Sequence, residues 1–222
     1  MSSFHQTDFN SLFEFKTLTK IHGEPTYNSL RTLKNELKAN TSSIRSDLGG
    51  GSNGHLGLIL TPAEYALVCP FPYVRPVRPI APVFPANTVQ HAATRFRDDF
   101  KEEKRVFNEA NDLDKILIAQ IITAIDNEYI EELRNEITNT ITDDCVTVLT
   151  WLFTNYGRIQ RETLQDQENK LTSFVYNIQD PLGKLYTKVQ QLEELATAAN
   201  NPYSVTQLIN FGLDAIKRTH DF

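Results

Sequence analysis

The distribution of apolar residues predicts a predominantly helical protein. Apolar side chains recur at spacings of three and four along most of the chain, and such spacing places them on one face of a helix. In the stretch 142–157 they cover nearly the whole helix surface, which is typical of a helix buried on several sides. Either Thr142 or Asp143 is placed to cap its first turn. We therefore expect this stretch to be the central helix, with Trp151, the only tryptophan, in the middle of the core.

Other apolar segments are expected to complete the core. After an interruption at 111–112, residues 113–125 form a strongly apolar helix, and residues 129–137 continue its apolar stripe. Asp180 starts a further helix and Ser204 caps the last one. The predicted core residues are Leu117, Ile121, Leu149, Trp151, Leu152, Tyr156, Leu185 and Leu192.

The front of the chain has a less regular pattern. Residues 1–25 carry scattered phenylalanines without helical spacing, and we interpret them as an arm that docks either on the body or on a neighbouring chain. A short amphipathic helix is expected over 27–40, followed by a flexible Ser-, Gly- and Asn-rich loop over 41–57. Residues 56–60 fit a short strand. Residues 61–64 then match a capping box with proline at the first helical position, which predicts a brief helix.

Six prolines within residues 70–86 exclude a helix and predict an extended, polyproline-like segment. Two interpretations fit this composition: a linker or strap that lies across the body, or a docking segment for another chain. Arg75 and Arg78 lie between the prolines and are candidates for contacting an anion. Together with Phe9 and Phe13 of the arm, they are the candidate assembly contacts.

These elements predict an all-α fold: a bundle of about six to eight helices with an extended Pro-rich segment and an irregular N-terminal arm. The expected divisions are an arm over 1–25, a region of short helices, Gly-rich loop and Pro-rich strap over 26–86, and a helical core over 87–222 that begins at a cap, Thr88. A boundary between two lobes is expected near 138–142, where polar Thr and Asn residues interrupt the apolar stripes.

Composition and charge exclude several classes of protein. The net charge of −6 divides into +2 over residues 1–86 and −8 over the rest, which argues against a chain that grips nucleic acid by itself. The two cysteines, Cys69 and Cys145, lack the spacing of a zinc site, and a disulfide framework is not expected from them. This cysteine content is typical of a protein from a reducing compartment. We expect no signal peptide and no transmembrane helix, because no run of 18 apolar residues occurs, and we place the protein in the cytoplasm.

Motifs for catalysis or cofactor binding are missing from the sequence. His55 follows the Gly49–Gly54 stretch where a phosphate-binding loop needs a lysine, and the five histidines lie too far apart in sequence for a metal site. Adjacent acidic residues, such as Asp143 and Asp144, point apart on a helix and are expected to be solvated. Cys145 has no histidine near it in sequence. We therefore expect no enzymatic activity, no metal and no cofactor.

The order of these segments resembles the Gag capsid region of copia-type LTR retrotransposons. The residues Trp151 to Ile159 look like the family's "L-F-x-x-Y-G-x-I" helix end, and the Gly-rich stretch is similar to one found in its front half. Further similar segments run over 33–40, 48–58, 180–199, 202–210 and 219–222. The resemblance therefore covers most of the chain.

This resemblance implies an all-α structural protein that self-associates into a shell, or virus-like particle, around the element's RNA. The partner is then the protein itself, as a homo-oligomer, with packaged RNA inside and no membrane. The chain contains no C-x2-C-x4-H-x4-C zinc knuckle, which is the family's usual RNA-binding part. The alternative function is a domesticated, Gag-derived helical module that binds a peptide or partner protein in a groove between helices.

Overall fold

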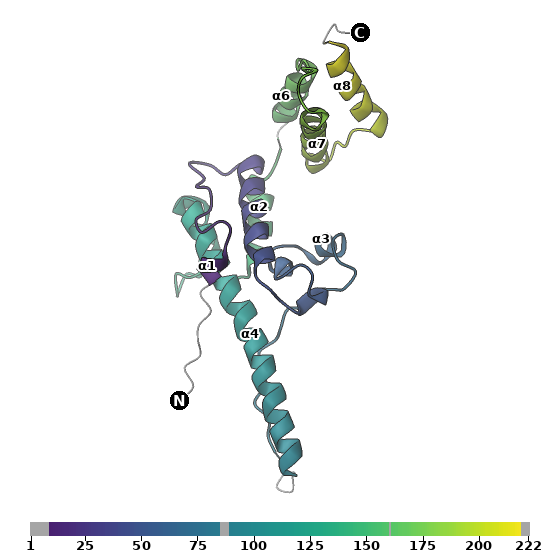
Figure 1. The fold of residues 1–222 in the computed structure, drawn as a ribbon. Helices are drawn as coiled ribbons and strands as arrows, with labels where there is room; N and C mark the ends of the chain where they lie inside the picture. The colour runs from purple at the N-terminus through teal and green to yellow at the C-terminus, as the bar shows by residue number, and fades with distance from the viewer. Residues whose placement is uncertain (1–8, 85–88, 160, 219–222) are drawn as a thin grey trace. The chain divides into compact units, whose positions relative to one another are not determined.

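The computed structural model describes residues 9–84, 89–159 and 161–218, and within these ranges it is all-helical (Figure 1). The described part contains eight α-helices and no strand beyond isolated β-bridges, which confirms the predicted fold class. The predicted cap Thr88 and the segment 219–222 lie outside the described residues. The helices are α1 (Phe9–Leu12), α2 (Tyr27–Ser43), α3 (Pro62–Ala66), α4 (Gln90–Ala124), α5 (Cys145–Tyr156), α6 (Arg161–Thr172), α7 (Leu182–Ala198) and α8 (Val205–Lys217).

Two compact units make up the chain, Met1–Tyr156 and Gly157–Phe222. The boundary therefore follows α5, and the predicted boundary near 138–142 is wrong. That polar stretch belongs to a closed turn of the first unit, because the Asn135 amide donates to the Thr140 carbonyl at 2.9 Å and the Asn139 amide donates to the Asn135 carbonyl at 2.8 Å. A polar interruption thus marks a surface turn here, and the predicted single core over 87–222 is divided between the two units.

The core of the first unit lies between α2, α4 and α5. Leu37 of α2, Leu117 and Ile121 of α4, and Leu149 and Leu152 of α5 are all buried in one cluster. Burying a leucine side chain contributes roughly 1.5–3 kcal/mol, so these helices are stabilised chiefly by packing against one another. The predicted core residues on α4 and α5 other than the two aromatics are therefore confirmed.

Helix α4 is longer than the sequence pattern indicated. It runs unbroken through Asn111 and Asp112, where an interruption was predicted, and ends at Ala124 instead of continuing towards residue 137. Asn and Asp each cost less than about 0.7 kcal/mol in a helix interior, and the burial of Leu113 and Leu117 outweighs that cost. Beyond α4 the chain turns through two short 3₁₀ segments, Asn127–Tyr129 and Glu131–Leu133.

Helix α5 begins one residue later than a cap at Asp143 predicts and two residues later than a cap at Thr142 predicts, and its tryptophan lies at the edge of the core. Asp144, not Thr142 or Asp143, caps the helix: its Oδ1 accepts from the Thr147 amide at 2.8 Å. Trp151 and Tyr156 are only partly buried, with ring centroids 5.8 Å apart. The prediction that Trp151 occupies the centre is wrong, because the fully buried face of α5 carries Cys145, Val148, Leu149 and Leu152.

From Phe9 onward, the N-terminal arm packs onto its own body. Phe9 and Phe13 are each only 4% exposed and belong to the main core cluster, so they are not the exposed assembly contacts that we predicted. Fully buried Asn40 fixes the arm: its Oδ1 accepts from the Phe15 amide and its Nδ2 donates to the Phe15 carbonyl, both at 2.8 Å. Asn40 Nδ2 also donates to Gln120 Oε1 at 3.1 Å.

Replacing Asn40 with aspartate is expected to lower the free energy of unfolding by about 1–3 kcal/mol, because a carboxylate cannot donate to the Phe15 carbonyl and would be buried as a charge. Urea unfolding followed by circular dichroism measures this. Asn28→Asp is the matched control, since Asn28 is exposed in the first turn of α2, where a negative charge is tolerated. Equal losses in the two variants would contradict the role assigned to Asn40.

The segment 41–57, predicted to be a flexible loop, is folded: α2 extends through residues 41–43, and the rest forms a loop held by hydrogen bonds. Residues 56–60 include a 3₁₀ turn (Leu56–Leu58) where a strand was predicted. Gly49 and Gly54 are buried with φ of +57° and +55°. The Gly49 carbonyl accepts from Tyr65 Oη at 3.2 Å and from Cys69 Sγ at 3.0 Å. The capping box at α3 is confirmed, with the Glu64 amide donating to Thr61 Oγ1.

The second unit consists of α6, α7 and α8 packed together. Leu185 and Leu192 of α7 are buried as predicted, but they belong to this unit and not to the core around α5. Ser204 caps α8 through a capping box with Gln207, which confirms that prediction. Only Ala215 of α8 is buried, so this helix contributes little of its apolar surface to the core of its own unit.

Candidate interaction surfaces

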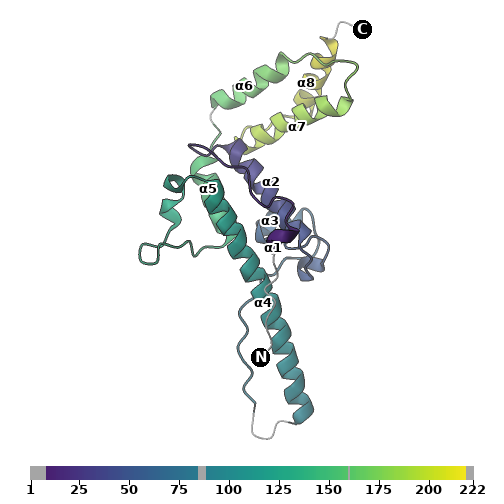
Figure 2. The same cartoon turned by 60° about the vertical axis from the view of Figure 1, so that its left-hand side comes forward.

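Residues 70–84, which we call the strap, run beside the N-terminal half of α4 (Figures 1 and 2). Tyr73 fixes the beginning of the strap. Its ring lies against Gly57, where an added Cβ would come within 2.1 Å of it, and it meets the Tyr65 ring edge-on at 5.7 Å. Its hydroxyl lies 3.0 Å from Nδ1 of the buried His55. The glycine loop and the strap are therefore packed as one structure.

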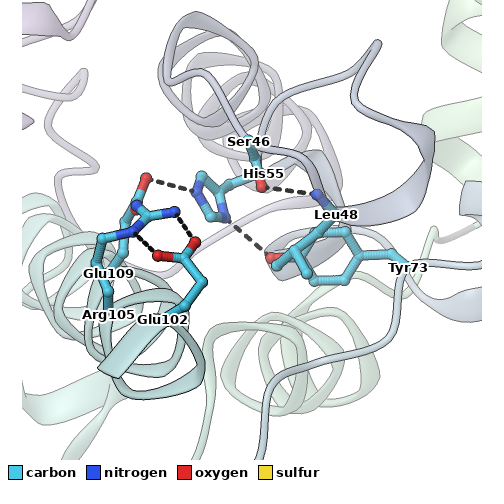
Figure 3. A network of polar contacts seen from close by, with 7 residues as sticks. All are labelled: Ser46, Leu48, His55, Tyr73, Glu102, Arg105 and Glu109. Atoms are coloured by element: carbon cyan, nitrogen blue, oxygen red, sulfur yellow. Dashed lines mark hydrogen bonds and ion pairs between the residues drawn. The ribbon is translucent and has the colours of Figure 1, made fainter. Parts of the chain in front are cut away.

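A chain of polar contacts extends from Tyr73 to the surface of α4 (Figure 3). His55 Nε2 lies 3.5 Å from Glu109 Oε1, and Glu109 accepts from Arg105 at 2.7 Å. Arg105 also binds Glu102 through two nitrogens, at 2.7 and 3.0 Å. The hydrogen bond with His55, together with the Arg105 charge, holds the pKa of Glu109 below its usual value although burial opposes this. The network joins loop, strap and α4, and every member has a partner, as a stabilising network requires.

Arg75 links the strap to two of the core helices, α4 and α5. Its Nη2 donates to Asp114 of α4 at 2.6 Å and its Nη1 donates to Asp144, the cap of α5, at 3.0 Å. Burial raises the pKa of Asp114, and the Arg75 charge only partly offsets this. Burial also acts to raise the pKa of Asp144, but hydrogen bonds with Thr147 and the Arg75 charge outweigh it and lower that pKa. Arg75 is thus an internal contact and not an assembly contact, whereas Arg78 is exposed on the strap.

From Val74 onward, the sequence follows a three-residue repeat, Val/Ile-x-Pro, that ends at Pro85. Exposure follows the same period: Pro76, Pro79 and Pro82 are half-buried, whereas the aliphatic side chains are 68–93% exposed. A polyproline helix has three residues per turn, so side chains three apart share one face. The exposed face of the strap therefore carries Val74, Val77, Ile80 and Val83.

A groove of about 420 Å³ lies between α7 and α8 in the second unit. Among the described residues that line the groove, Glu193 alone is charged. The others are apolar or uncharged, and one of them, Tyr186, is aromatic. Four of the lining side chains are 55–73% exposed, which leaves an open apolar surface on a small unit. These four are Leu182, Tyr186, Val205 and Ile209.

The predicted assembly contacts do not come together in the structure. Phe9 and Phe13 lie in the core and Arg75 lies in an ion-pair network, which leaves only Arg78 on an exposed surface. The exposed aliphatic residues of the strap were not singled out from the sequence, although the three-residue repeat was visible in it. Val205 and Ile209 of α8 are exposed although their helical spacing is that of an apolar face, because spacing does not indicate what covers such a face.

The described residues contain no group of His, Cys, Asp and Glu side chains that fits a metal ion. Complete burial raises the pKa of the Cys145 thiol well above its usual value, and the nearby Asp114 carboxylate adds to this. A thiol in this environment is a poor nucleophile. Within the part of the chain that the structure describes, no helix is long and apolar enough to cross a membrane.

No family model, curated protein or solved structure matches this chain.

Proposed function

We propose that this protein is a structural subunit that associates with copies of itself, as a Gag-like capsid protein does when it forms a virus-like particle around retrotransposon RNA in the cytoplasm. The observation that carries the proposal is the open apolar groove between α7 and α8. The resemblance of the sequence to copia-type Gag supports the same function. No catalytic role is included in the proposal, since the polar clusters described above join structural elements.

The composition of the groove favours a protein partner over a small polar ligand. Side chains such as Tyr186, Val205 and Ile209 remain exposed although the unit is small, and apolar contact is the main favourable contribution to protein association. Among the described residues of α8, only Asp214 and Lys217 carry charge. The α8 side of the groove therefore adds little charge to a protein contact. Symmetry then lets weak contacts repeat in a closed assembly.

Light scattering of the purified protein at increasing concentration, with electron microscopy of the same samples, tests the proposal. Ile209→Asp is expected to weaken self-association at least about tenfold, because it places a charge in an apolar contact. Asn210→Asp is the matched control: it adds the same charge at the next residue of α8, which does not line the groove. A wild-type protein that stays monomeric at all concentrations would overturn the proposal.

A second function, a Gag-derived module that binds another protein, is favoured by the same groove, since an amphipathic helix can lie in such a groove. It predicts a monomeric chain whose groove binds a foreign peptide. The scattering measurement therefore separates the two functions.

A further inference from the structure

We infer that the strap of one copy binds in the α7–α8 groove of a neighbouring copy. This inference rests on the proposed self-association and names the two surfaces that make the contact. The surface that occupies the groove is the exposed face of the strap, which carries Val77, Ile80 and Val83.

The two surfaces have matching chemistry. Polyproline-type segments are bound in grooves lined with aromatic side chains, and the groove presents Tyr186 among aliphatic residues. The strap presents an aliphatic side chain at every third residue, and a polyproline helix rises about 3.1 Å per residue, so these side chains recur about every 9 Å. In the proposed contact, this row of side chains packs against the apolar residues of α7 and α8 that line the groove.

The charges of the two surfaces are complementary, which favours pairing the strap with the groove. Arg78 lies exposed between Val77 and Ile80, and Glu193 is the charged residue of the groove. In the proposed contact, an arginine next to the apolar row therefore meets the carboxylate that lines the groove. A groove paired with a second groove would instead bring two Glu193 side chains into one apolar contact, where like charges are unfavourable.

The strap is also held in place before it binds. Tyr73 and Arg75 fix its start, and Phe84 near its end lies under the Arg97 guanidinium at 5.2 Å. A segment that is already ordered loses little conformational entropy on binding. The strap and the groove are different surfaces, so a contact between them is head-to-tail. Repeated head-to-tail contacts produce rings, shells or filaments.

A mixing experiment tests the inference. The strap variant is Val77→Ser with Ile80→Ser, and the groove variant is Tyr186→Ser with Ile209→Ser; all four side chains are more than half exposed, so folding should be retained. Light scattering after size-exclusion chromatography is expected to show each variant alone as a monomer. An equimolar mixture should form a dimer and nothing larger, because the groove of the strap variant accepts the strap of the groove variant.

Other outcomes overturn the inference in distinguishable ways. A strap variant that assembles like the wild type, or a mixture that stays monomeric while the wild type assembles, refutes the strap-to-groove contact and leaves self-association standing. A monomeric wild type refutes both, including the case in which the strap fills the groove of its own chain.

Exchanging the two charges provides an independent test. Arg78→Glu and Glu193→Arg are each expected to weaken association about tenfold, and the chain that carries both changes should recover most of the loss. Absence of recovery would show that these two residues do not meet.

Discussion

Gly54→Ala is expected to lower the free energy of unfolding of the first unit by about 3 kcal/mol or more. Gly54 has φ of +55°, and its Cβ would meet the carbonyl oxygens of Ile44, Thr41 and Ser42 at 2.4, 2.7 and 2.9 Å. The left-handed conformation costs an alanine about 1–2 kcal/mol, and overpacking of a filled site costs about 1–3 kcal/mol more. These neighbours are backbone atoms, so they cannot move aside by changing a rotamer.

Gly23→Ala separates the two contributions. Gly23 has a similar φ of +72°, but no atom lies within 4 Å of the added Cβ. Its loss should therefore be only about 1–2 kcal/mol, the conformational contribution alone. Urea unfolding of both variants, followed by circular dichroism, measures the difference, and equal losses would show that the space around Gly54 is not restricted as described.

The second large effect is expected from Arg75→Met, which should lower the free energy of unfolding by about 2–4 kcal/mol at pH 7. The change leaves Asp114, which is 5% exposed, without its cation, and it also removes a partner of Asp144. The loss is expected to be smaller than for a fully buried pair, because the Arg75 side chain is 38% exposed. Arg78→Met removes the same charge from an exposed position and should leave stability unchanged.

The loss in the Arg75 variant should also depend on pH. The folded-state pKa of Asp114 is raised, so the folded protein takes up this proton before the unfolded chain does as the pH falls. The group therefore favours the folded state at low pH, and that contribution disappears as the pH rises through the folded-state pKa. Without the guanidinium this pKa rises further, so the difference from wild type should shrink between pH 7 and pH 5. A constant difference would mean that Asp114 is not the residue left unpaired.

Local signals in the sequence predicted local structure well. The caps at Thr61 and Ser204 and the helical fold follow from hydrogen bonds and spacings within a few residues, and both caps are confirmed. The buried residues Leu117 and Leu152 follow from the same periodicity. Periodicity does not show which partner covers an apolar face: Leu185 faces the core of its own unit, whereas Ile209 faces outward.

The interaction surfaces depend on contacts between residues far apart in sequence. Arg75 has the same composition around it as Arg78, yet one binds Asp114 and Asp144 and the other is exposed. That difference arises because Arg75 lies within reach of Asp114 on α4 and of Asp144 at the start of α5, a proximity that no local pattern encodes. The unit boundary after Tyr156 was missed for a similar reason, since the polar turn near residue 140 is closed by its own hydrogen bonds.

The docking of the N-terminal arm has a consequence for protein synthesis. The Phe15 carbonyl accepts from Gln120, a residue made 105 positions later in the chain. At about 5–20 residues per second, the ribosome adds those residues in roughly 5–20 s. During that interval Phe9 and Phe13 have no completed core to enter, and their apolar rings are accessible to chaperones or to other nascent chains. The core of the first unit can close only after α4 and α5 have left the ribosome, because both helices contribute to it.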